Sequence, residues 1–280
     1  MRQGNLFTRT HHGIVGNAPF FSLLVGMAAT IIACSPEAQP VASEEAASAV
    51  PQDAVATPLD RSVLDDPTRP DADRAEDSGR RAIDIYEWLG MQPSMTVADL
   101  WPAEGYNTHL MSRLMGADGH VLSVLGFFGL DTDYSTREGL QQRIQDHGMS
   151  NVELLSKLAD MRSGSVDVMV AVRSYHDLGT VPGPSRPEAV AEMHRALKPG
   201  GVVGIVEAAS DKPGWDPETH RLSEQTVIDE FTAAGFELSE RSDMLGNPTD
   251  DRSKTGFEEG TYDGRHDTDR YLLKFTKPTS

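Results

Sequence analysis

The sequence predicts an α/β protein of three layers, with a mostly parallel seven-stranded sheet between two layers of helices. Short apolar runs of strand length alternate with longer amphipathic stretches of helical period along residues 81–280. Strands separated by helices need crossover connections, which make neighbouring strands parallel and place helices on both faces of the sheet. The last two strands lack an obvious helix between them, so we expect a C-terminal antiparallel hairpin.

The strands are predicted where apolar and β-branched residues gather between turn residues. The most apolar run, Val166–Val172, is typical of a strand that is buried on both faces. In chain order the predicted strands are Thr96–Trp101, His120–Leu125, Val152–Leu155, Val166–Val172, Val202–Glu207, Phe236–Arg241 and Tyr271–Phe275.

The helices are predicted from apolar residues that recur three and four positions apart. Gly90 and Gly235 each end a helix, because glycine readily takes the left-handed conformation that follows the last turn. Pro199 stops another helix before the strand that follows it. The predicted helices are Ala82–Leu89, Thr108–Met115, Arg137–His147, Pro187–Leu197 and Ser223–Ala234.

Composition excludes several classes of function. The 280 residues include 25 basic and 43 acidic side chains, a net charge of −18, which repels phosphate backbones and argues against nucleic-acid binding. Apolar residues make up 38%, a low share for one compact domain, so part of the chain is expected outside the core. A single cysteine excludes an intrachain disulfide and argues against a cysteine zinc site. Composition does not set the oligomeric state.

Residues 1–33 have the pattern of an export signal. Arg2 and Arg9 precede an apolar run of fifteen residues, Pro19–Ala33, which is shorter than the roughly 20 residues of a membrane span. The run ends at Cys34 and resembles the bacterial lipoprotein signal, which implies lipidation of Cys34. A plain secretory signal and a retained anchor are the alternatives. Since Ser35 follows the cysteine, we expect the periplasmic side of the outer membrane, with the lipid anchor as the only membrane contact.

Residues 34–58 are predicted to form a disordered acidic tether, and residues 59–280 the folded domain. Residues 35–80 hold eleven acidic residues against four arginines and are rich in Ala, Pro and Ser. Residues 59–80 are expected to form a lid or helical segments on the domain.

Four local sequences occur in the order of a known family. They are Asp99-Leu100-Trp101-Pro102-Ala103-Glu104-Gly105, Asp167-Val168-Met169-Val170, Leu197-Lys198-Pro199-Gly200-Gly201 and Ala233-Ala234-Gly235-Phe236. Together they resemble the Rossmann-like fold of class I S-adenosylmethionine (SAM)-dependent methyltransferases over residues 81–280. Three further motifs resemble a bacterial group of predicted, often exported, methyltransferases: Tyr175-His176-Asp177, His220-Arg221 and Asn247-Pro248-Thr249-Asp250. The resemblance implies SAM as the cofactor and methyl transfer to an unidentified small molecule.

The loop after the first strand departs from the family pattern of acid-x-Gly-x-Gly-x-Gly. Glycines there let the backbone approach the cofactor, and the acid meets its amino acid portion. Trp101 and Ala103 stand where the first two glycines are expected. Ala103 fits if its φ is negative, whereas Trp101 either stacks on a ligand or fills the pocket. The resemblance assigns cofactor binding to Asp99, Trp101, Ala103, Gly105 and Tyr106.

The second strand lacks the acid that holds the cofactor's ribose in this family. The first acidic residues after it are Asp131 and Asp133, while Phe127 and Phe128 either flank an adenine or pack in the core. These departures leave three cases open: SAM, an altered ligand, or none.

Polar residues follow the fourth and fifth strands, at the carboxyl edge where open α/β sheets bind ligands. His176 is predicted as a general base, with Asp177 orienting it or binding substrate, and His220 as a second base. A surface turn and a helix cap are the alternatives for these residues.

Substrate contacts are predicted for Tyr175 and Glu207 from their position at this edge. A substrate contact is also predicted for Arg221, because arginine binds a carboxylate or phosphate well. His176, Asp177, Glu207 and His220 include the ligand types of a divalent metal site. Their spacing does not show that they converge, so no metal is predicted.

A polar insertion, residues 242–270, is predicted between the last two strands, as a lid or as solvated surface. His109 and Met111 are expected to serve packing rather than function. The leading hypothesis for the protein is a SAM-dependent methyltransferase. The alternatives are a non-catalytic ligand-binding lipoprotein of the envelope and other chemistry at the sheet edge, including metal-dependent hydrolysis.

Overall fold

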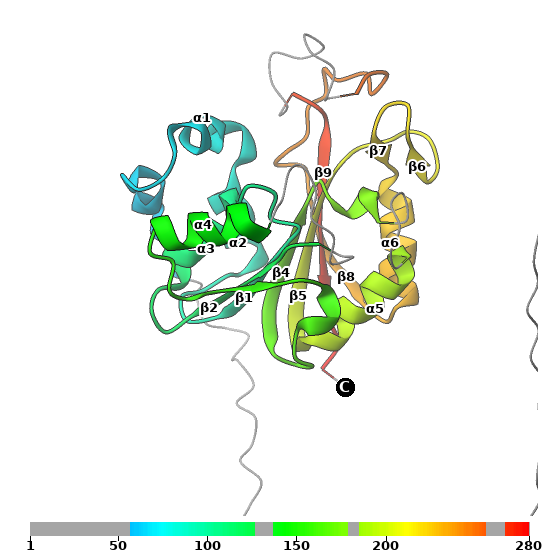
Figure 1. Ribbon diagram of the computed structural model, residues 1–280. Coiled ribbons are helices and arrows are strands. Elements are labelled where there is room, and N and C mark those ends of the chain that lie inside the picture. The colour runs from blue at the N-terminus through cyan, green and yellow to red at the C-terminus, as the bar shows by residue number, and fades with distance from the viewer. Residues whose placement is uncertain (1–56, 127–136, 179–184, 256–266, 280) are drawn as a thin grey trace, which may run out of the picture. The chain divides into compact units, whose positions relative to one another are not determined.

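A computed structural model describes residues 57–126, 137–178, 185–255 and 267–279 (Figure 1). Every described residue belongs to one compact unit, Asp53–Ser280. The predicted signal, Cys34 and most of the tether lie outside the described residues. So do Phe127, Phe128, Asp131, Asp133 and the middle of the polar insertion.

A seven-stranded sheet forms the middle layer, with the order β3-β2-β1-β4-β5-β9-β8. The neighbouring strands β3, β2, β1, β4 and β5 pair in parallel, and β9 pairs antiparallel with both β5 and β8. The predicted α/β class and C-terminal hairpin are therefore confirmed. The strands are β1 Thr96–Leu100, β2 His120–Val124, β3 Val152–Leu155, β4 Val166–Val172, β5 Leu197–Ala208, β8 Glu237–Ser242 and β9 Arg270–Thr276.

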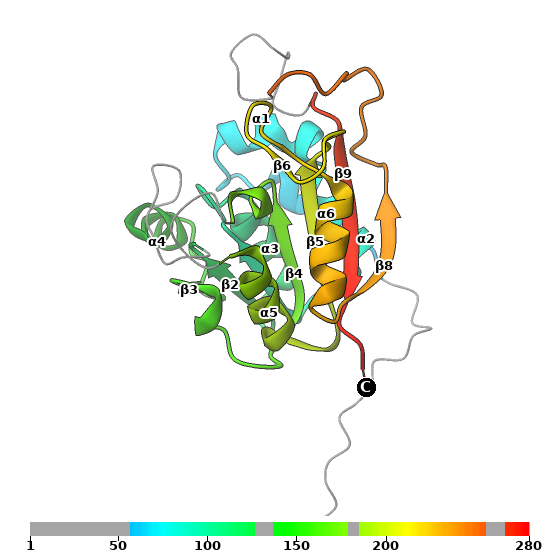
Figure 2. The ribbon, with the colours of Figure 1, turned by 90° about the vertical axis from the view of Figure 1, so that its right-hand side faces the viewer.

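Helices cover both faces of this sheet, as Figures 1 and 2 show. Neighbouring residues of β1 point to opposite faces: Ala98 packs in the cluster that contains α5 and α6, and Val97 in the cluster that contains α2 and α3. The α-helices are α1 Asp71–Arg80, α2 Ala82–Leu89, α3 Tyr106–Met115, α4 Arg137–Asp146, α5 Arg186–Ala196 and α6 Glu224–Ala233. The 3₁₀ helices are η1 Arg61–Asp65, η2 Leu158–Asp160 and η3 Tyr175–Asp177.

The segment 59–80 forms helical structure that is docked on the α2–α3 side of the sheet. Leu59 is buried in that core cluster. The buried guanidinium of Arg69 binds the Asp77 carboxylate through two hydrogen bonds, the Nη1–Oδ2 bond being 2.9 Å long. These contacts make η1 and α1 part of the folded domain.

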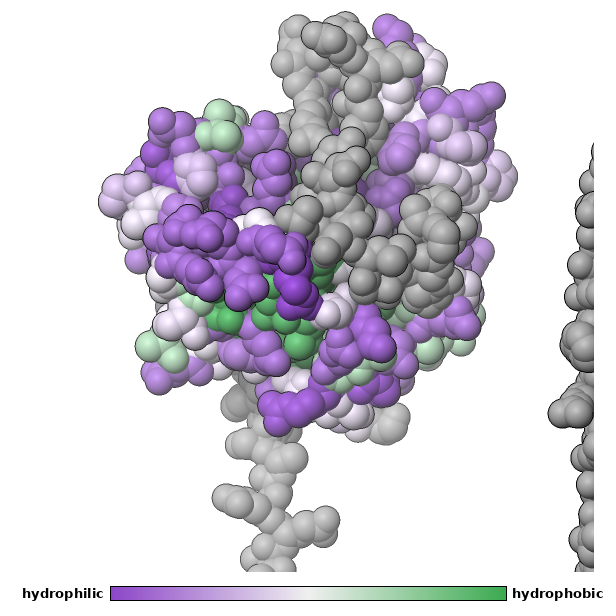
Figure 3. Space-filling model, in the orientation of Figure 1, coloured by the Kyte–Doolittle hydropathy of each residue, from purple (hydrophilic) through white to green (hydrophobic). Residues whose placement is uncertain are grey.

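A second, two-stranded antiparallel sheet was not predicted. Its strands, β6 Trp215–Asp216 and β7 Arg221–Leu222, are too short for a periodic pattern to reveal them. Figure 3 shows a mostly hydrophilic surface on the face viewed in Figure 1, as the net charge of −18 leads one to expect. Within the described ranges, no helix is long and apolar enough to cross a bilayer.

Candidate functional site at the carboxyl edge of the sheet

The loop from β1 to α3 has left-handed backbone at alternate residues. The φ angles are 60° at Trp101, 50° at Ala103 and 88° at Gly105. The condition under which Ala103 would fit easily, a negative φ, is therefore not met. A side chain in this conformation costs roughly 1–2 kcal/mol, and such strain persists mainly where function requires it. The loop keeps the backbone of a glycine loop although two of its glycines are replaced.

Asp99 is buried at the end of β1 and is held by the first turn of α3. Its carboxylate accepts a hydrogen bond from the Thr108 hydroxyl over 2.6 Å. The Thr108 backbone N–H and the Asn107 side-chain amide also donate to it. Burial nevertheless raises the pKa of Asp99 to about 6, because these hydrogen bonds only partly replace lost water. The site thus contains a carboxylate whose charge is costly in the free protein.

Gly105 and Tyr106 pack against other helices in this structure. A side chain at Gly105 would meet the side chains of Leu140 at 2.9 Å and Arg143 at 3.2 Å on α4, and the φ of 88° there also favours glycine. The Tyr106 hydroxyl donates to Asp77 of α1 over 2.7 Å. Cofactor contacts of these two residues stay predictions.

The structure brings His176, Asp177, Glu207 and His220 together. His176, in η3 just after β4, places its Nδ1 2.7 Å from Glu207 Oε2 and its Nε2 2.7 Å from His220 Nε2. Asp177 Oδ1 lies 3.4 Å from His176 Nε2. The His176 backbone N–H also donates to Glu207 Oε1 over 3.1 Å. The carboxylate nearest to the His176 ring is therefore that of Glu207, which was predicted to contact substrate, and the orienting role of Asp177 stays a prediction.

Three elements create this convergence. Val172, the last residue of β4, pairs with Val206 of β5, and β5 continues to Ala208, so Glu207 lies beside the start of η3. The β6–β7 hairpin then returns the chain to this edge, with Leu222 bridged to Ala209 at the end of β5. His220 stands before β7 with a left-handed φ of 56°, a further strained position at the same edge.

Electrostatics divide the two histidines into different roles. Burial lowers the pKa of His176, but the Glu207 carboxylate outweighs it, and the net effect is a raised pKa. Burial and the positive charge of His176 lower the pKa of His220 to about 4. Burial raises the pKa of Asp177, although the nearby His176 opposes this. Protonation is thus favoured on the buried His176 ring, whereas the His220 ring stays neutral, as a general base must be.

Trp215 is a site residue that the sequence analysis missed. Its ring stacks on His176 with a centroid distance of 4.7 Å and an interplanar angle of 5°. It also meets His220 edge-on at 4.6 Å. A large aromatic residue in a short polar loop was the one available signal, because a two-residue strand shows no period.

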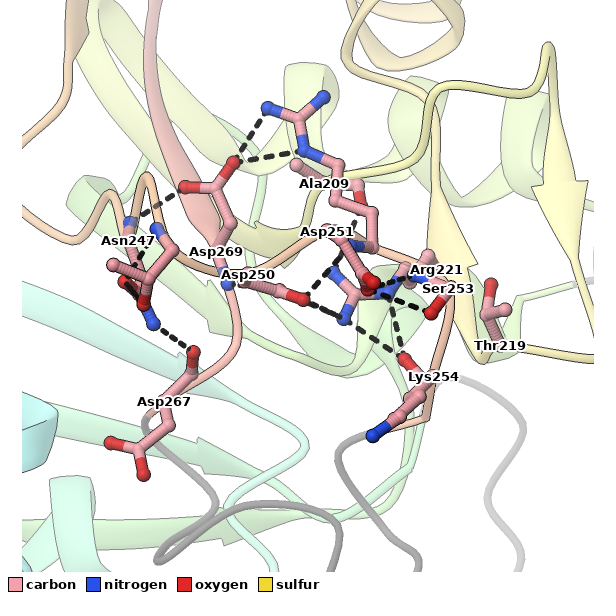
Figure 4. Close-up of polar contacts among 12 residues, drawn as sticks. Ala209, Thr219, Arg221, Asn247, Asp250, Asp251, Ser253, Lys254, Asp267 and Asp269 are labelled. Carbon is pink, nitrogen blue, oxygen red and sulfur yellow. Dashed lines mark hydrogen bonds and ion pairs between the residues drawn. The ribbon is translucent and has the colours of Figure 1, made fainter.

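Tyr175 and Arg221 have their polar groups inside the protein. Tyr175 is fully buried, and its hydroxyl donates to Glu230 of α6 over 2.6 Å. The Arg221 guanidinium donates to the carbonyl of Ala209 and binds the buried Asp250 carboxylate with an Nη2–Oδ2 distance of 2.9 Å (Figure 4). Substrate contacts of both residues stay predictions, while their present contacts stabilise the fold.

The described parts of the polar insertion are held by hydrogen bonds. The Asn247 backbone N–H donates to Asp269 Oδ1 over 2.8 Å, and the Asp269 N–H donates to Asp250 Oδ2 over 2.6 Å (Figure 4). Arg252 Nη2 binds the Asp269 carboxylate over 2.6 Å. Residues 243–255 are therefore anchored on the start of β9. His266 and Asp263 lie outside the described residues.

Comparison with known proteins supports the fold assignment. A family model described as a methyltransferase domain matches residues 110–205, about a third of the chain, from within α3 to within β5. That match begins after the altered loop. None of the curated proteins matches the chain significantly.

Solved structures resemble the domain over most of its length. A SAM-dependent methyltransferase from Aquifex aeolicus is 17% identical, covers 78% of this chain and 98% of its own, with a TM-score of 0.54. The [4+2]-cyclase SpnF is 16% identical, its alignment covers 72% of this chain and 82% of SpnF, and its TM-score is also 0.54. The domain therefore has the class I methyltransferase fold, which at this identity fixes architecture and not activity.

Proposed function

We propose that the protein is a SAM-dependent methyltransferase that acts on a small molecule. The observation that carries this proposal is the loop after β1, where Trp101 and Ala103 keep left-handed φ angles of 60° and 50° at the cost of strain. A loop with no ligand to approach would gain stability by relaxing to ordinary angles. The methyltransferase-domain match and the shared fold support the same function.

The cofactor-binding residues would be those at the end of β1. SAM, when bound, supplies the methyl group. Asp99, buried and with a pKa raised to about 6, is suited to bind a cationic amino group, because such a partner would favour its ionised form. The backbone at 101–105 would lie against the ligand.

The histidine cluster would serve the substrate side. Methyl transfer needs a nucleophile in line with the methyl group, and holding it there provides much of the rate. His220, partly exposed and neutral, would accept the proton of the nucleophile, and the Glu207 carboxylate would stabilise the positive charge that results on the histidine pair.

The alternative is a non-catalytic lipoprotein of the envelope that binds a ligand on the same fold. One observation favours it: Trp101 is partly buried and packs against the core beside the loop, where it can fill cofactor space. We also propose that Cys34 is lipidated and that the domain faces the periplasm, from the signal-like pattern of residues 1–34.

Calorimetric titration of the full chain with SAM, and with its demethylated product, tests the proposal. We expect micromolar binding that Asp99→Ala abolishes and that the exposed-site control Asp146→Ala leaves unchanged. No heat up to millimolar ligand, from a chain that is folded by circular dichroism, would refute SAM-dependent transfer and favour the binding lipoprotein.

A further inference from the structure

We propose that His176, His220 and Asp177 bind a divalent first-row transition metal ion, with zinc as the type case. The three side chains offer two imidazole nitrogens and one carboxylate oxygen, and these atoms all lie within 4.8 Å of one another. Two imidazoles and a carboxylate form a known catalytic zinc ligand set that leaves one position open. The proposal stands apart from SAM binding, because none of the three residues lies in the β1 loop.

Two of the three distances between ligand atoms are close to those around a tetrahedral ion. Two ligand atoms at about 2.0–2.1 Å from a tetrahedral zinc ion lie about 3.4 Å apart. His176 Nε2 and Asp177 Oδ1 are already 3.4 Å apart. The two Nε2 atoms, at 2.7 Å, must separate by about 0.7 Å to reach that spacing. At 2.7 Å they share one proton, and the metal ion would take the place of that proton.

Glu207 prepares His176 for this role. Its buried carboxylate accepts the Nδ1–H proton over 2.7 Å, which directs the lone pair of Nε2 toward His220 and Asp177. Metal-binding histidines almost always donate their other ring N–H to a carboxylate or carbonyl in this way. The ring of Trp215, stacked on His176 at 4.7 Å, prevents the imidazole from turning.

The surroundings leave room for a substrate and balance the charge. His176 and Glu207 are buried, whereas the Asp177 side chain is 30% exposed, so the open coordination position faces the solvent side. The carboxylates of Asp177 and Glu207 offset the two charges of the ion, against the positive charge of nearby Arg173. An oxygen, nitrogen or sulfur group of a small molecule at the open position would lose its proton more easily.

Metal binding to the full chain, stripped with chelator and without SAM, tests the site. We expect Zn²⁺ to bind and raise the melting temperature, and Co²⁺ to give visible ligand-field absorption. His220→Gln should lower the affinity for Zn²⁺ by more than tenfold and abolish that absorption. Glu207→Gln should weaken binding by about 10–100-fold, as expected for a residue that supports a ligand.

His120→Gln is the matched control. His120 also pairs with a carboxylate, since its Nε2 lies 3.1 Å from Glu153 Oε2, but on an exposed edge away from the cluster. His11, His12 and Cys34 are present in every variant, so their metal binding cancels in the comparison. Equal Zn²⁺ affinity and equal Co²⁺ spectra for wild type, His220→Gln and Asp177→Asn, all folded, would overturn the proposal.

Discussion

Asp99 makes the stability of the domain depend on pH in a way that one substitution can isolate. Its ordinary pKa is 3.8, and burial raises it to about 6 in the folded protein. Between these values the unfolded chain releases the proton and the folded chain keeps it. Stability from this group is therefore complete below pH 3.8 and is lost as the pH rises through about 6. Asp99→Asn removes the titration and leaves the shape unchanged.

The magnitude follows from the shift. Raising the pKa from 3.8 to about 6 corresponds to about 3 kcal/mol, at roughly 1.4 kcal/mol per unit. The free energy of unfolding of Asp99→Asn, minus that of wild type, should thus rise by up to about 3 kcal/mol between pH 4 and pH 7.5. The amide also loses an acceptor for the Thr108 or Asn107 donors, but that cost is the same at every pH and cancels.

Urea unfolding at pH 4, 5, 6 and 7.5 measures this difference directly. Asp146→Asn is the control, because Asp146 is an exposed carboxylate that accepts one hydrogen bond from Gln142 over 2.7 Å. A difference between Asp99→Asn and wild type that stays constant across this range would refute the reasoning. The burial cost of the carboxylate would then be absent, and with it a reason to regard Asp99 as a poised functional group.

Three further predictions concern stability. Ala103→Gly should stabilise the chain by about 1 kcal/mol, because glycine adopts the φ of 50° without strain. Ala233→Gly, exposed on α6, should instead destabilise it by about 1 kcal/mol. Equal melting temperatures for the two variants would contradict this. Arg221→Met removes the cationic partner of the buried Asp250 carboxylate and should cost about 3–5 kcal/mol in urea unfolding. Arg241→Met, at an exposed ion pair, should cost at most about 1 kcal/mol, and a similarly small loss at Arg221 would refute its structural role. Burial, aided by Arg143 and Arg113, lowers the pKa of His109 to about 4, so the free energy of unfolding should fall as the pH drops from 6.5, by up to about 1.4 kcal/mol per pH unit. His109→Gln should remove this pH dependence, and the same pH dependence in wild type and variant would argue against the prediction.

The fold could be predicted because its signals are local and repeated. Each helix between two apolar runs requires a crossover, and the chain from Lys198 to Gly201 marks a helix end before a strand, so parallel pairing follows from known connection rules. The order of the strands in the sheet comes from the structure. The start of β5 differs from prediction: Leu197 pairs with Val166, which extends the strand through this turn sequence.

The candidate site could be predicted only in part. Sequence placed His176 and Glu207 at the same edge, because both follow parallel strands. It could not show that Glu207 turns toward His176, since side-chain direction at a strand end depends on the pairing register. His220 lies 44 residues from His176 and is brought to it by a hairpin with two residues in each strand, which no periodic pattern reveals. The sign of φ at Ala103 depends on the loop around it and not on alanine itself.

The buried ion pair of Arg221 has a consequence for the histidine that precedes it. Because His220 and Arg221 are joined by a peptide bond, the segment that carries Asp250 fixes the angle from which the imidazole enters the cluster. Substitutions in this insertion, which is distant in sequence, can therefore change the distance between the imidazole rings of His176 and His220 without altering either residue. Protein engineers could therefore change the geometry of the histidine cluster through substitutions in the insertion alone.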